Sequence, residues 1–378
     1  MKAFVGIGFG PIQSGLFIYE AYRSGNFDRL TVADVDESVV QEVRRSGGDY
    51  TVNIAGPDGI TQHVVRGIRI FNPTDPADFK ELVTAVMEAD EIATALPSVK
   101  FYDKIGYLKE GLSQRDPEHP VVIYTSENNN HAAEILAKEL DADNLSENIQ
   151  FLNTVIGKMS GVIDDPAEQQ RLGLASLAPD GKSAVLVEEF NKILISRILL
   201  SGFHRGIEVF EEKDDLLPFE EAKLYGHNAI HALLGFLGLE RGCVSMADVA
   251  QHPDILQTGR EAFLLESGAG LLHRHSGIDP LFTPEGFKAY ADDLLARMTN
   301  PFLSDALDRV VRDPRRKLGW DDRLVGAMRL ALDAGVTPQR LATGVRAAAM
   351  LMFHEELRAL WPTEAWENGE AASIASLI

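Results

Sequence analysis

The chain has 378 residues, of which 45% are hydrophobic and 25% charged, so it is long enough for two domains and needs no disulfides to stabilise its core. Its formal net charge of −21 argues against nucleic acid or an anionic membrane surface as a partner, because both attract basic proteins. A single cysteine, Cys243, excludes a disulfide framework, and the lack of any run of about 18 apolar residues argues against a membrane span, so we expect a cytoplasmic protein.

The first 150 residues alternate two kinds of segment. Short apolar runs typical of strands occupy residues 2–8, 29–36, 91–97 and 120–128. Segments with helical spacing, such as 11–25 and 37–48, follow them. This alternation predicts a doubly wound α/β fold, in which helices cover both faces of a parallel sheet.

The rest of the chain departs from this alternation. Residues 50–71 carry a Gly-Pro-Asp-Gly turn between β-rich runs, which predicts an inserted hairpin or meander. The pattern loosens between 157 and 189, and from Phe190 onward apolar residues recur almost wholly at helical spacing. We therefore predict two domains, an α/β domain over residues 1–189 and an all-α domain over residues 190–378.

A glycine cluster follows the first apolar run directly. Gly6, Gly8 and Gly10 precede a helical segment that begins at Pro11, and this arrangement lets backbone N–H groups approach a pyrophosphate at the start of a helix. Gln13 replaces the third glycine of the usual pattern. That glycine serves helix–strand packing, so the replacement weakens the match to the pattern without affecting the phosphate contacts. The rival interpretation is a structural glycine turn. The predicted cofactor loop comprises Gly8, Phe9, Gly10, Pro11, Ile12 and Gln13.

An acidic residue supports the dinucleotide interpretation. Asp34 ends the second apolar run, where a carboxylate can accept hydrogen bonds from the adenosine ribose hydroxyls. It would also repel a 2′-phosphate, and Asp36 adds to that repulsion. The sequence therefore predicts a Rossmann-type domain that binds NAD in preference to NADP.

The segment KLYGHNAIHALLGFLG, residues 223–238, begins with polar side chains and continues as an apolar helix. On an α-helix Lys223, His227 and His231 lie on one face, and Asn228 lies within reach of it. Such a face suits hydride transfer from a polyol, because a buried lysine whose pKa falls from about 10.4 toward roughly 7–8 can take the hydroxyl proton. Asparagine and histidine can hold the substrate oxygen.

Spacing alone leaves two other interpretations of this segment open. His227 and His231 have the four-residue spacing of helical zinc ligands, although no third ligand lies nearby in the sequence and Lys223 would repel a cation. Otherwise, the polar residues are the solvated start of a helix.

Several short blocks, in the same order, resemble one family. Lys223, Asn228 and His231 have the spacing of the catalytic set in the polyol-specific long-chain dehydrogenases, the mannitol dehydrogenase family. The blocks GFGPIQSG, ADVDESVV, SENNNHAAEIL, ESGAGLL and NPFLSDALDRVVRDPRRKL are similar to stretches of that family, from its glycine loop to its helical domain. The resemblance implies NAD as the cofactor, no metal, and a monomer.

The resemblance also implies a role for each matching residue. The implied catalytic residues are Lys223 as the general base, Asn228 and His231 as binders of the substrate and its oxyanion, and Asn153 as an assistant to the oxyanion. His227 falls on a position that the family does not use for chemistry. The implied cofactor site gains Leu96, Glu127 and Asn128 at the carboxyl edge of the sheet.

A basic block stands out in this acidic chain. The sequence RVVRDPRRKL is similar to a block typical of the sugar-phosphate members of the family, and arginine forks suit phosphate. The residues expected to bind a substrate phosphate are Arg312, Arg315, Arg316 and Lys317. The rival interpretation is a solvated basic helix end.

Three positions depart from the family pattern. Gly157 stands where the family has an acid, Lys158 where it has an arginine, and Ile193 where a tryptophan is common. We expect these positions to lie near the substrate and to bear on its identity.

The expected function is reversible hydride transfer between NAD and a hexitol phosphate similar to mannitol 1-phosphate, in an active site to which both domains contribute. One alternative is a dehydrogenase of an unphosphorylated polyol or a hexuronate, which Asn153 favours. Another is a catalytically silent NAD-binding sensor, which the departures from the family pattern favour.

Overall fold

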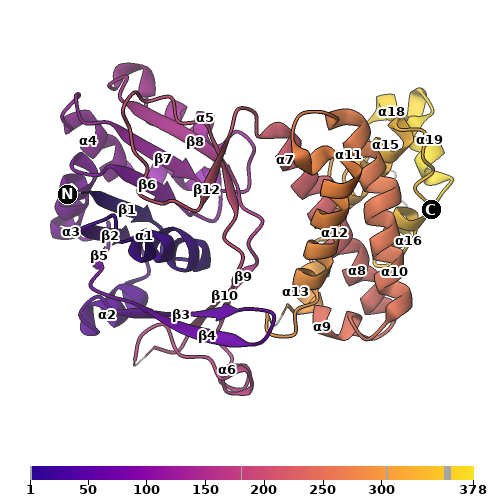
Figure 1. Ribbon diagram of the computed structural model, residues 1–378, viewed down its shortest axis with the longest axis horizontal. Helices are drawn as coiled ribbons and strands as arrows, with labels where there is room; N and C mark the ends of the chain where they lie inside the picture. Colours follow the sequence, from indigo (N-terminus) through magenta and orange to yellow (C-terminus); the bar gives the residue numbers. More distant parts are fainter. Residues whose placement is uncertain (1, 180, 304, 353–358) are drawn as a thin grey trace. The chain divides into compact units, whose positions relative to one another are not determined.

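A computed structural model describes residues 2–179, 181–303, 305–352 and 359–378. The chain divides into two compact units, Met1–Leu216 and Leu217–Ile378 (Figure 1). The division falls after Leu216 rather than after residue 189, because strands β11 (Ile193–Ser196) and β12 (Phe210–Lys213) belong to the sheet of the first unit.

The first unit is built on an eight-stranded sheet in the order β12-β11-β8-β7-β6-β1-β2-β5. Its parallel part consists of β1 (Ala3–Ile7), β2 (Arg29–Ala33), β5 (Arg69–Phe71), β6 (Glu91–Thr94), β7 (Val121–Thr125) and β8 (Ile149–Val155). From β5 to β8 these six strands follow the strand order of a dinucleotide-binding domain. The predicted doubly wound α/β fold is therefore confirmed for this unit.

Both faces of the sheet are buried, which explains why its strands are continuously apolar. Successive strand residues point to opposite faces, so Phe4 packs into one core and Val5 into the other. The helical segments that follow the strands are η1 (Gln13–Phe17), α1 (Ile18–Ser24), α2 (Glu37–Arg45), α3 (Pro76–Met87), η2 (Val99–Lys104), α4 (Gly106–Gln114), α5 (Ala132–Glu139) and η3 (Ala142–Asn144).

A second, smaller sheet completes the first unit. Its strand order is β4-β3-β10-β9, formed by β3 (Tyr50–Ala55), β4 (Ile60–Val65), β9 (Ser160–Ile163) and β10 (Ala184–Glu188), and α6 (Pro166–Leu172) precedes β10. The turn between β3 and β4 is closed by the Gly56 N–H donating to the Gly59 carbonyl at 2.9 Å. The hairpin predicted within residues 50–71 is therefore confirmed, and its last strand-like run is β5 of the large sheet (Figure 1).

The second unit is helical. Its elements are α7 (Leu217–Glu221), η4 (Ala222–Asn228), α8 (Ala229–Glu240), α9 (Met246–Val249), α10 (Pro253–Ala262), η5 (Phe263–Ser267), α11 (Gly268–His275), η6 (Pro280–Phe282), α12 (Pro284–Met298), α13 (Leu307–Val311), α14 (Pro314–Lys317), α15 (Arg323–Asp333), α16 (Gln339–Ala349), α18 (Thr363–Glu367) and α19 (Glu370–Ala375). No helix among the described residues is long and apolar enough to cross a membrane.

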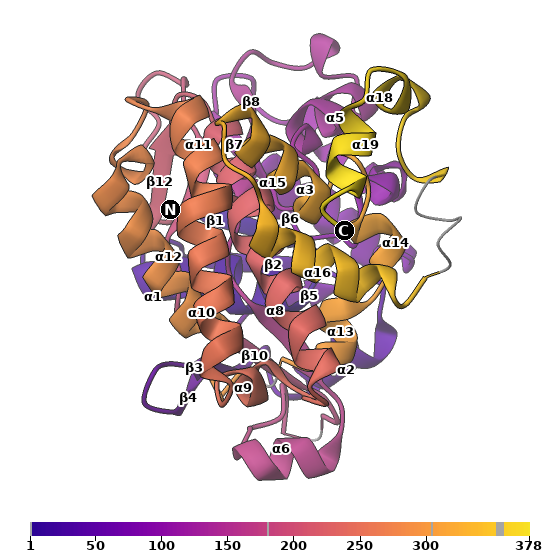
Figure 2. The same ribbon diagram turned by 90° about the vertical axis from the view of Figure 1, so that its right-hand side faces the viewer.

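Helix α8 is the centre of this unit and packs against α9, α10, α13, α15 and α16 (Figure 2). Its glycines allow these close contacts: a Cβ added at Gly235 would lie 2.6 Å from the Val310 side chain of α13. Helix α8 is buried on nearly every side. The polar residues at its start, Asn228 and His231, are therefore surrounded mainly by protein.

Candidate functional site

The glycine loop between β1 and η1 has one glycine that the fold requires and one that faces open space. Gly8 has a φ of +82°, its N–H donates to the Ala33 carbonyl at 2.8 Å, and an added Cβ would lie 2.7 Å from the Ala95 carbonyl oxygen. Gly10 has nothing within 4 Å of an added Cβ. The loop is therefore tied to neighbouring strand ends at Gly8 and open at Gly10, where a phosphate group can approach the backbone.

Gln13 takes part in the packing of this loop through its side chain. It is fully buried, and a Cβ added at Gly6 would lie 2.2 Å from the Gln13 side-chain nitrogen. In the usual pattern a third glycine on the helix allows the helix to pack closely against the strand. Here Gly6 on β1 makes room for the Gln13 side chain on the helix. The Gln13 amide therefore points into the protein, and the cofactor contact expected of this residue is not one its side chain can make in this conformation.

Asp34 lies at the carboxyl end of β2 and holds the glycine loop. One carboxylate oxygen accepts the Phe9 N–H at 2.5 Å, and the other accepts the Asp36 N–H at 2.7 Å. Asp36 in turn caps the N-terminus of α2. Two carboxylates thus stand together beyond β2, an arrangement that suits ribose hydroxyls and repels an additional phosphate.

Glu127 joins the ends of two neighbouring strands. Its buried carboxylate accepts hydrogen bonds from the Thr94 hydroxyl at 2.8 Å, the Tyr102 hydroxyl at 2.5 Å and the Leu96 N–H at 2.8 Å. Burial and this carboxylate raise the pKa of Tyr102. Glu127 therefore shapes the loop after β6 from inside the protein, whereas Asn128 is exposed at the edge of the sheet.

Asn153 caps a helix in the first unit. On β8, its side-chain oxygen accepts the Ala133 N–H at 2.9 Å, and its side-chain nitrogen donates to the Glu134 carboxylate at 2.9 and 3.1 Å. Both ends of its amide are therefore engaged at the start of α5. An oxyanion contact from Asn153, which the family resemblance implies, stays a prediction.

Two of the departures from the family pattern have structural roles. Lys158 is buried, and its ammonium group donates to the backbone carbonyls of Glu188 and Phe190. Ile193 is fully buried within β11 and belongs to the core of the first unit. The expectation that Ile193 lies against the substrate is therefore wrong, because its side chain is enclosed by that core.

In the second unit, Lys223 and Asn228 lie within a π-helix, η4. A π-helix bonds each N–H to the carbonyl five residues back, so residues five apart are one hydrogen-bonded turn apart. The α-helical face expected from the sequence is therefore replaced by a π-helical turn that brings together Lys223 and Asn228. His231 follows on the first turn of α8.

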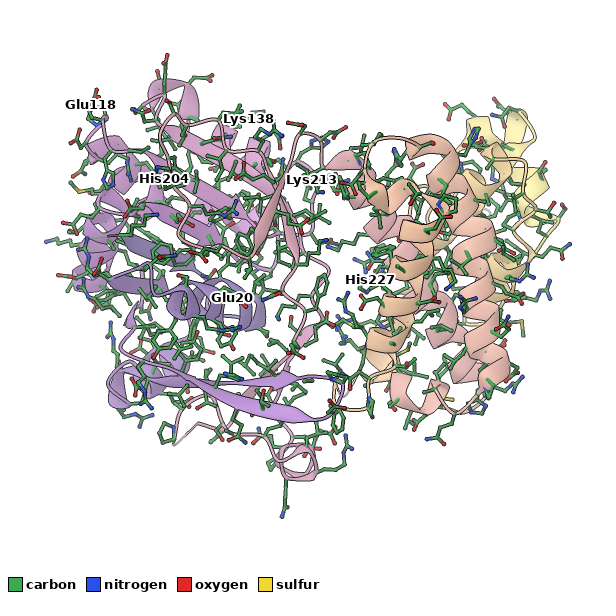
Figure 3. The ribbon with its side chains drawn as sticks, viewed as in Figure 1. Glu20, Glu118, Lys138, His204, Lys213 and His227 are labelled. Carbon is green, nitrogen blue, oxygen red and sulfur yellow. The ribbon has the colours of Figure 1, made fainter. Side chains whose placement is uncertain are left out.

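The electrostatic environment of η4 favours neutral side chains. Burial lowers the pKa of Lys223 to about 8, against the opposing effect of Glu220, and the charge of Arg323 lowers it further. Burial also lowers the pKa of His227 well below its usual value, assisted by His231 and Arg297. His227 is therefore neutral. It is labelled on the helical unit in Figure 3. The described residues contain no group of three His, Cys, Asp or Glu side chains placed to hold a metal ion.

His231 is paired with an acid that the sequence analysis missed. Its Nε2 lies 2.8 Å from Asp305 Oδ2, and the Asp305 side chain is 4% exposed. The other carboxylate oxygen of Asp305 accepts hydrogen bonds from Arg309 at 2.7 and 3.1 Å. His231 and Arg309 together hold the pKa of Asp305 below its usual value, although burial opposes them.

The basic block predicted to bind phosphate is split by the fold. Lys317 is buried, with its ammonium donating to the Arg312 carbonyl, and burial with the nearby charge of Arg323 lowers its pKa to about 8. The side chains of the other three predicted residues, Arg312, Arg315 and Arg316, are exposed.

Two cations missed by the sequence analysis complete this environment. Arg323 begins α15 and Arg297 lies near the end of α12, and each has a side chain only 14% exposed. Arg323 acts on Lys223, His227 and Lys317, so these groups share one positively charged region. We name Lys223, Arg297, Lys317 and Arg323 the cation cluster.

Comparison with known proteins places this geometry in a family. Residues 215–359 match the model of the mannitol dehydrogenase C-terminal domain. Mannitol-1-phosphate 5-dehydrogenase of Bacillus pumilus is 30% identical over 95% of this chain and 90% of its own length, and that of Bacillus licheniformis is 31% identical over 90% and 86%. The chain belongs to the mannitol dehydrogenase family.

Solved structures agree with this fold. Pseudomonas fluorescens mannitol 2-dehydrogenase, in a ternary complex with NAD and D-mannitol, has a TM-score of 0.68 and 18% identity over 92% of this chain and 78% of its own. A substrate-free D-sorbitol dehydrogenase has a TM-score of 0.72 and 15% identity over 93% and 80%. The matched C-terminal model spans η4, Asp305 and the cation cluster, so these features lie within the family's own domain.

Proposed function

We propose that this chain is an NAD-dependent polyol dehydrogenase in which Lys223 is the general base. The observation that carries the proposal is the place of Lys223 in η4, five residues before Asn228, where partial burial lowers its pKa to about 8. A base is most effective when its pKa lies near the working pH, and an ordinary lysine is protonated there. The names of the two Bacillus relatives, both mannitol-1-phosphate 5-dehydrogenases, support the same reaction class.

The residues present fit a dinucleotide. The open space at Gly10 admits a pyrophosphate to the loop backbone, and Asp34 is positioned for ribose hydroxyls. Asp36 and Glu37 follow it, so the end of β2 disfavours a 2′-phosphate and therefore NADP. When bound, the nicotinamide accepts the hydride that the polyol carbon releases.

The side chains of η4 and α8 supply the proton chemistry. Neutral Lys223 takes the proton of the hydroxyl on the reacting carbon as that carbon loses hydride. Asn228, one π-helical turn away, donates its amide N–H to the same oxygen and stabilises its developing charge. His231, held by Asp305, binds the polyol beside it.

For the substrate, we propose a hexitol phosphate similar to mannitol 1-phosphate. The cation cluster supports an anionic group on the substrate. Burial lowers the pKa of Lys317 and the nearby charge of Arg323 lowers it further, although Arg323 also pairs with Asp322 at 2.8 Å. A hexuronate would also supply an anion, and an unphosphorylated polyol would not.

The test is a panel of initial rates with NAD or NADH. Mannitol 1-phosphate, mannitol, fructose 6-phosphate and hexuronates are compared at equal concentrations, each with NADP or NADPH as a control. We expect NAD-linked turnover, highest with the hexitol phosphate and its ketose phosphate. Turnover confined to mannitol or a hexuronate would indicate a dehydrogenase of an unphosphorylated substrate. NADH binding without turnover on any substrate would indicate a catalytically silent sensor.

A further inference from the structure

The pairing of His231 with Asp305 fixes which ring nitrogen of the histidine carries the proton. Asp305 is ionised, since its pKa is lowered, and an ionised carboxylate can only accept hydrogen bonds. The bond of 2.8 Å from His231 Nε2 to Asp305 Oδ2 therefore requires a proton on Nε2. In the neutral ring this leaves Nδ1 without a proton, as a hydrogen-bond acceptor.

The acid is held rigidly in this role. Its side chain is 4% exposed, and two N–H groups of Arg309 occupy Oδ1 while His231 occupies Oδ2. Its backbone carbonyl accepts the Met246 N–H at 2.9 Å, and an isolated β-bridge joins Ser245 to Ala306. The histidine ring is 17% exposed, and among the described residues its Nδ1 has no hydrogen-bond partner. Nδ1 is thus the ring nitrogen available to a ligand.

We propose that Asp305 is a positioning residue that holds His231 with its proton on Nε2, so that Nδ1 accepts a hydrogen bond from a hydroxyl group of the polyol. The inference rests on the polyol dehydrogenase activity proposed above and refines it. In this tautomer His231 accepts a hydrogen bond from a hydroxyl group of the substrate, and Asn228 donates to the developing oxyanion. A linear polyol offers a hydroxyl on the carbon next to the reacting one, and a substrate that lacks this hydroxyl leaves Nδ1 unpaired.

The sharpest test changes the proton position without changing the shape of the side chain. In Asp305→Asn, the two N–H donors of Arg309 select the amide oxygen, so the amide nitrogen faces His231. An N–H group facing Nε2 makes that nitrogen an acceptor, and the ring proton moves to Nδ1. We expect kcat to fall at least about 10-fold, because losing the group that orients an active-site ligand or histidine costs between about 10-fold and about 10⁴-fold. The dissociation constant of NADH should stay within about twofold, because the glycine loop belongs to the other unit.

The proton position itself is measured by nitrogen-15 NMR of labelled histidine, at a pH where the imidazole is neutral. The His231 signals are assigned from their loss in His231→Gln. Wild-type protein should show the proton on Nε2, and Asp305→Asn should show it on Nδ1. In Asp305→Asn with Arg309→Met, the amide is free to turn its oxygen to the ring, and the proton should return to Nε2.

Asp308→Asn is the matched control. It removes the same charge three residues further on, from an exposed side chain on α13, and should leave both kcat and the His231 spectrum unchanged. A wild-type spectrum with the proton on Nδ1 would overturn the inference, even if Asp305→Asn failed to fold. Equal kcat values for Asp305→Asn and Asp308→Asn would overturn it as well. Because the spectrum needs no substrate, a failure of the proposed activity stays distinguishable from a failure of this inference.

Discussion

At the scale of single residues, the proposed chemistry depends on Lys223, whose pKa is lowered. Burial removes water from the Lys223 ammonium and lowers its pKa to about 8, and Glu220 only partly offsets this effect. The amine is the active base only when neutral, so the fraction of competent enzyme rises with pH up to that value and then levels off.

We therefore predict that kcat/KM for polyol oxidation increases tenfold per pH unit below about pH 8 and reaches a plateau above it. Reduction of the ketose should show the opposite slope, because that direction needs the protonated amine. The measurement is a pair of pH–rate profiles on the same preparation. Replacing Lys223 with methionine should reduce kcat by about 10²- to 10⁴-fold and remove this titration from both profiles. Residual turnover within a few-fold of wild type would contradict the assignment.

A second prediction at this scale concerns the phosphate. Replacing Lys317 or Arg323 with methionine should raise KM for a hexitol phosphate at least about tenfold, because each removes a largely buried cation that we propose binds the phosphate. The effect on an unphosphorylated polyol should be smaller. Arg315→Met is the control, since that side chain is exposed. An equal increase in KM for Arg315→Met and Lys317→Met would indicate that the exposed arginines bind the phosphate.

At the scale of secondary-structure elements, η4 shows what periodicity can and cannot reveal. The polar start and apolar continuation of residues 223–238 predict a buried helix correctly, but the sequence does not mark the π-helical turn that brings Lys223 and Asn228 together. Strands β11 and β12 have four residues each, too short for an alternating pattern to stand out from the helical segments around them. The sequence therefore predicts a boundary at residue 189, whereas the first compact unit extends through both strands to Leu216.

The loop between β1 and η1 yields a matched pair of substitutions. Gly8→Ala should destabilise the protein, because a φ of +82° costs a side chain about 1–2 kcal/mol and the added Cβ would lie 2.7 Å from the Ala95 oxygen. Gly10→Ala should leave the melting temperature unchanged, since its Cβ meets nothing within 4 Å. It should nevertheless weaken NADH binding at least about tenfold, because the methyl group enters the space proposed for the pyrophosphate. Calorimetry and fluorescence titration measure the two effects, and normal NADH affinity in Gly10→Ala would place the pyrophosphate elsewhere.

At the scale of the whole molecule, the sequence predicts local order better than long-range pairing. The alternating segments of the first unit predict a dinucleotide-binding sheet because each strand and helix signal is local. The contact between His231 and Asp305 joins residues 74 apart, and neither spacing nor composition indicates it. Arg297 and Arg323 were missed for the same reason, since only the packing of α12 and α15 in the folded unit brings them near η4.

The division into two compact units leads to a last prediction about the full chain. A ligand that binds only the folded protein stabilises it by about 2.7 kcal/mol at 100 times its dissociation constant, and local opening is suppressed most where the ligand is bound. NADH should therefore slow amide hydrogen exchange in residues 8–13 and 34–38 and at the ends of β6 and β7, which form the proposed cofactor site. Peptides from α16 and α19, at the C-terminal end of the second unit, should exchange at the same rate with and without NADH. Mass spectrometry of the intact chain under both conditions provides the measurement, with NADPH as the control ligand. Protection restricted to the second unit would contradict the glycine-loop site, and equal protection by NADPH would contradict the selectivity assigned to Asp34.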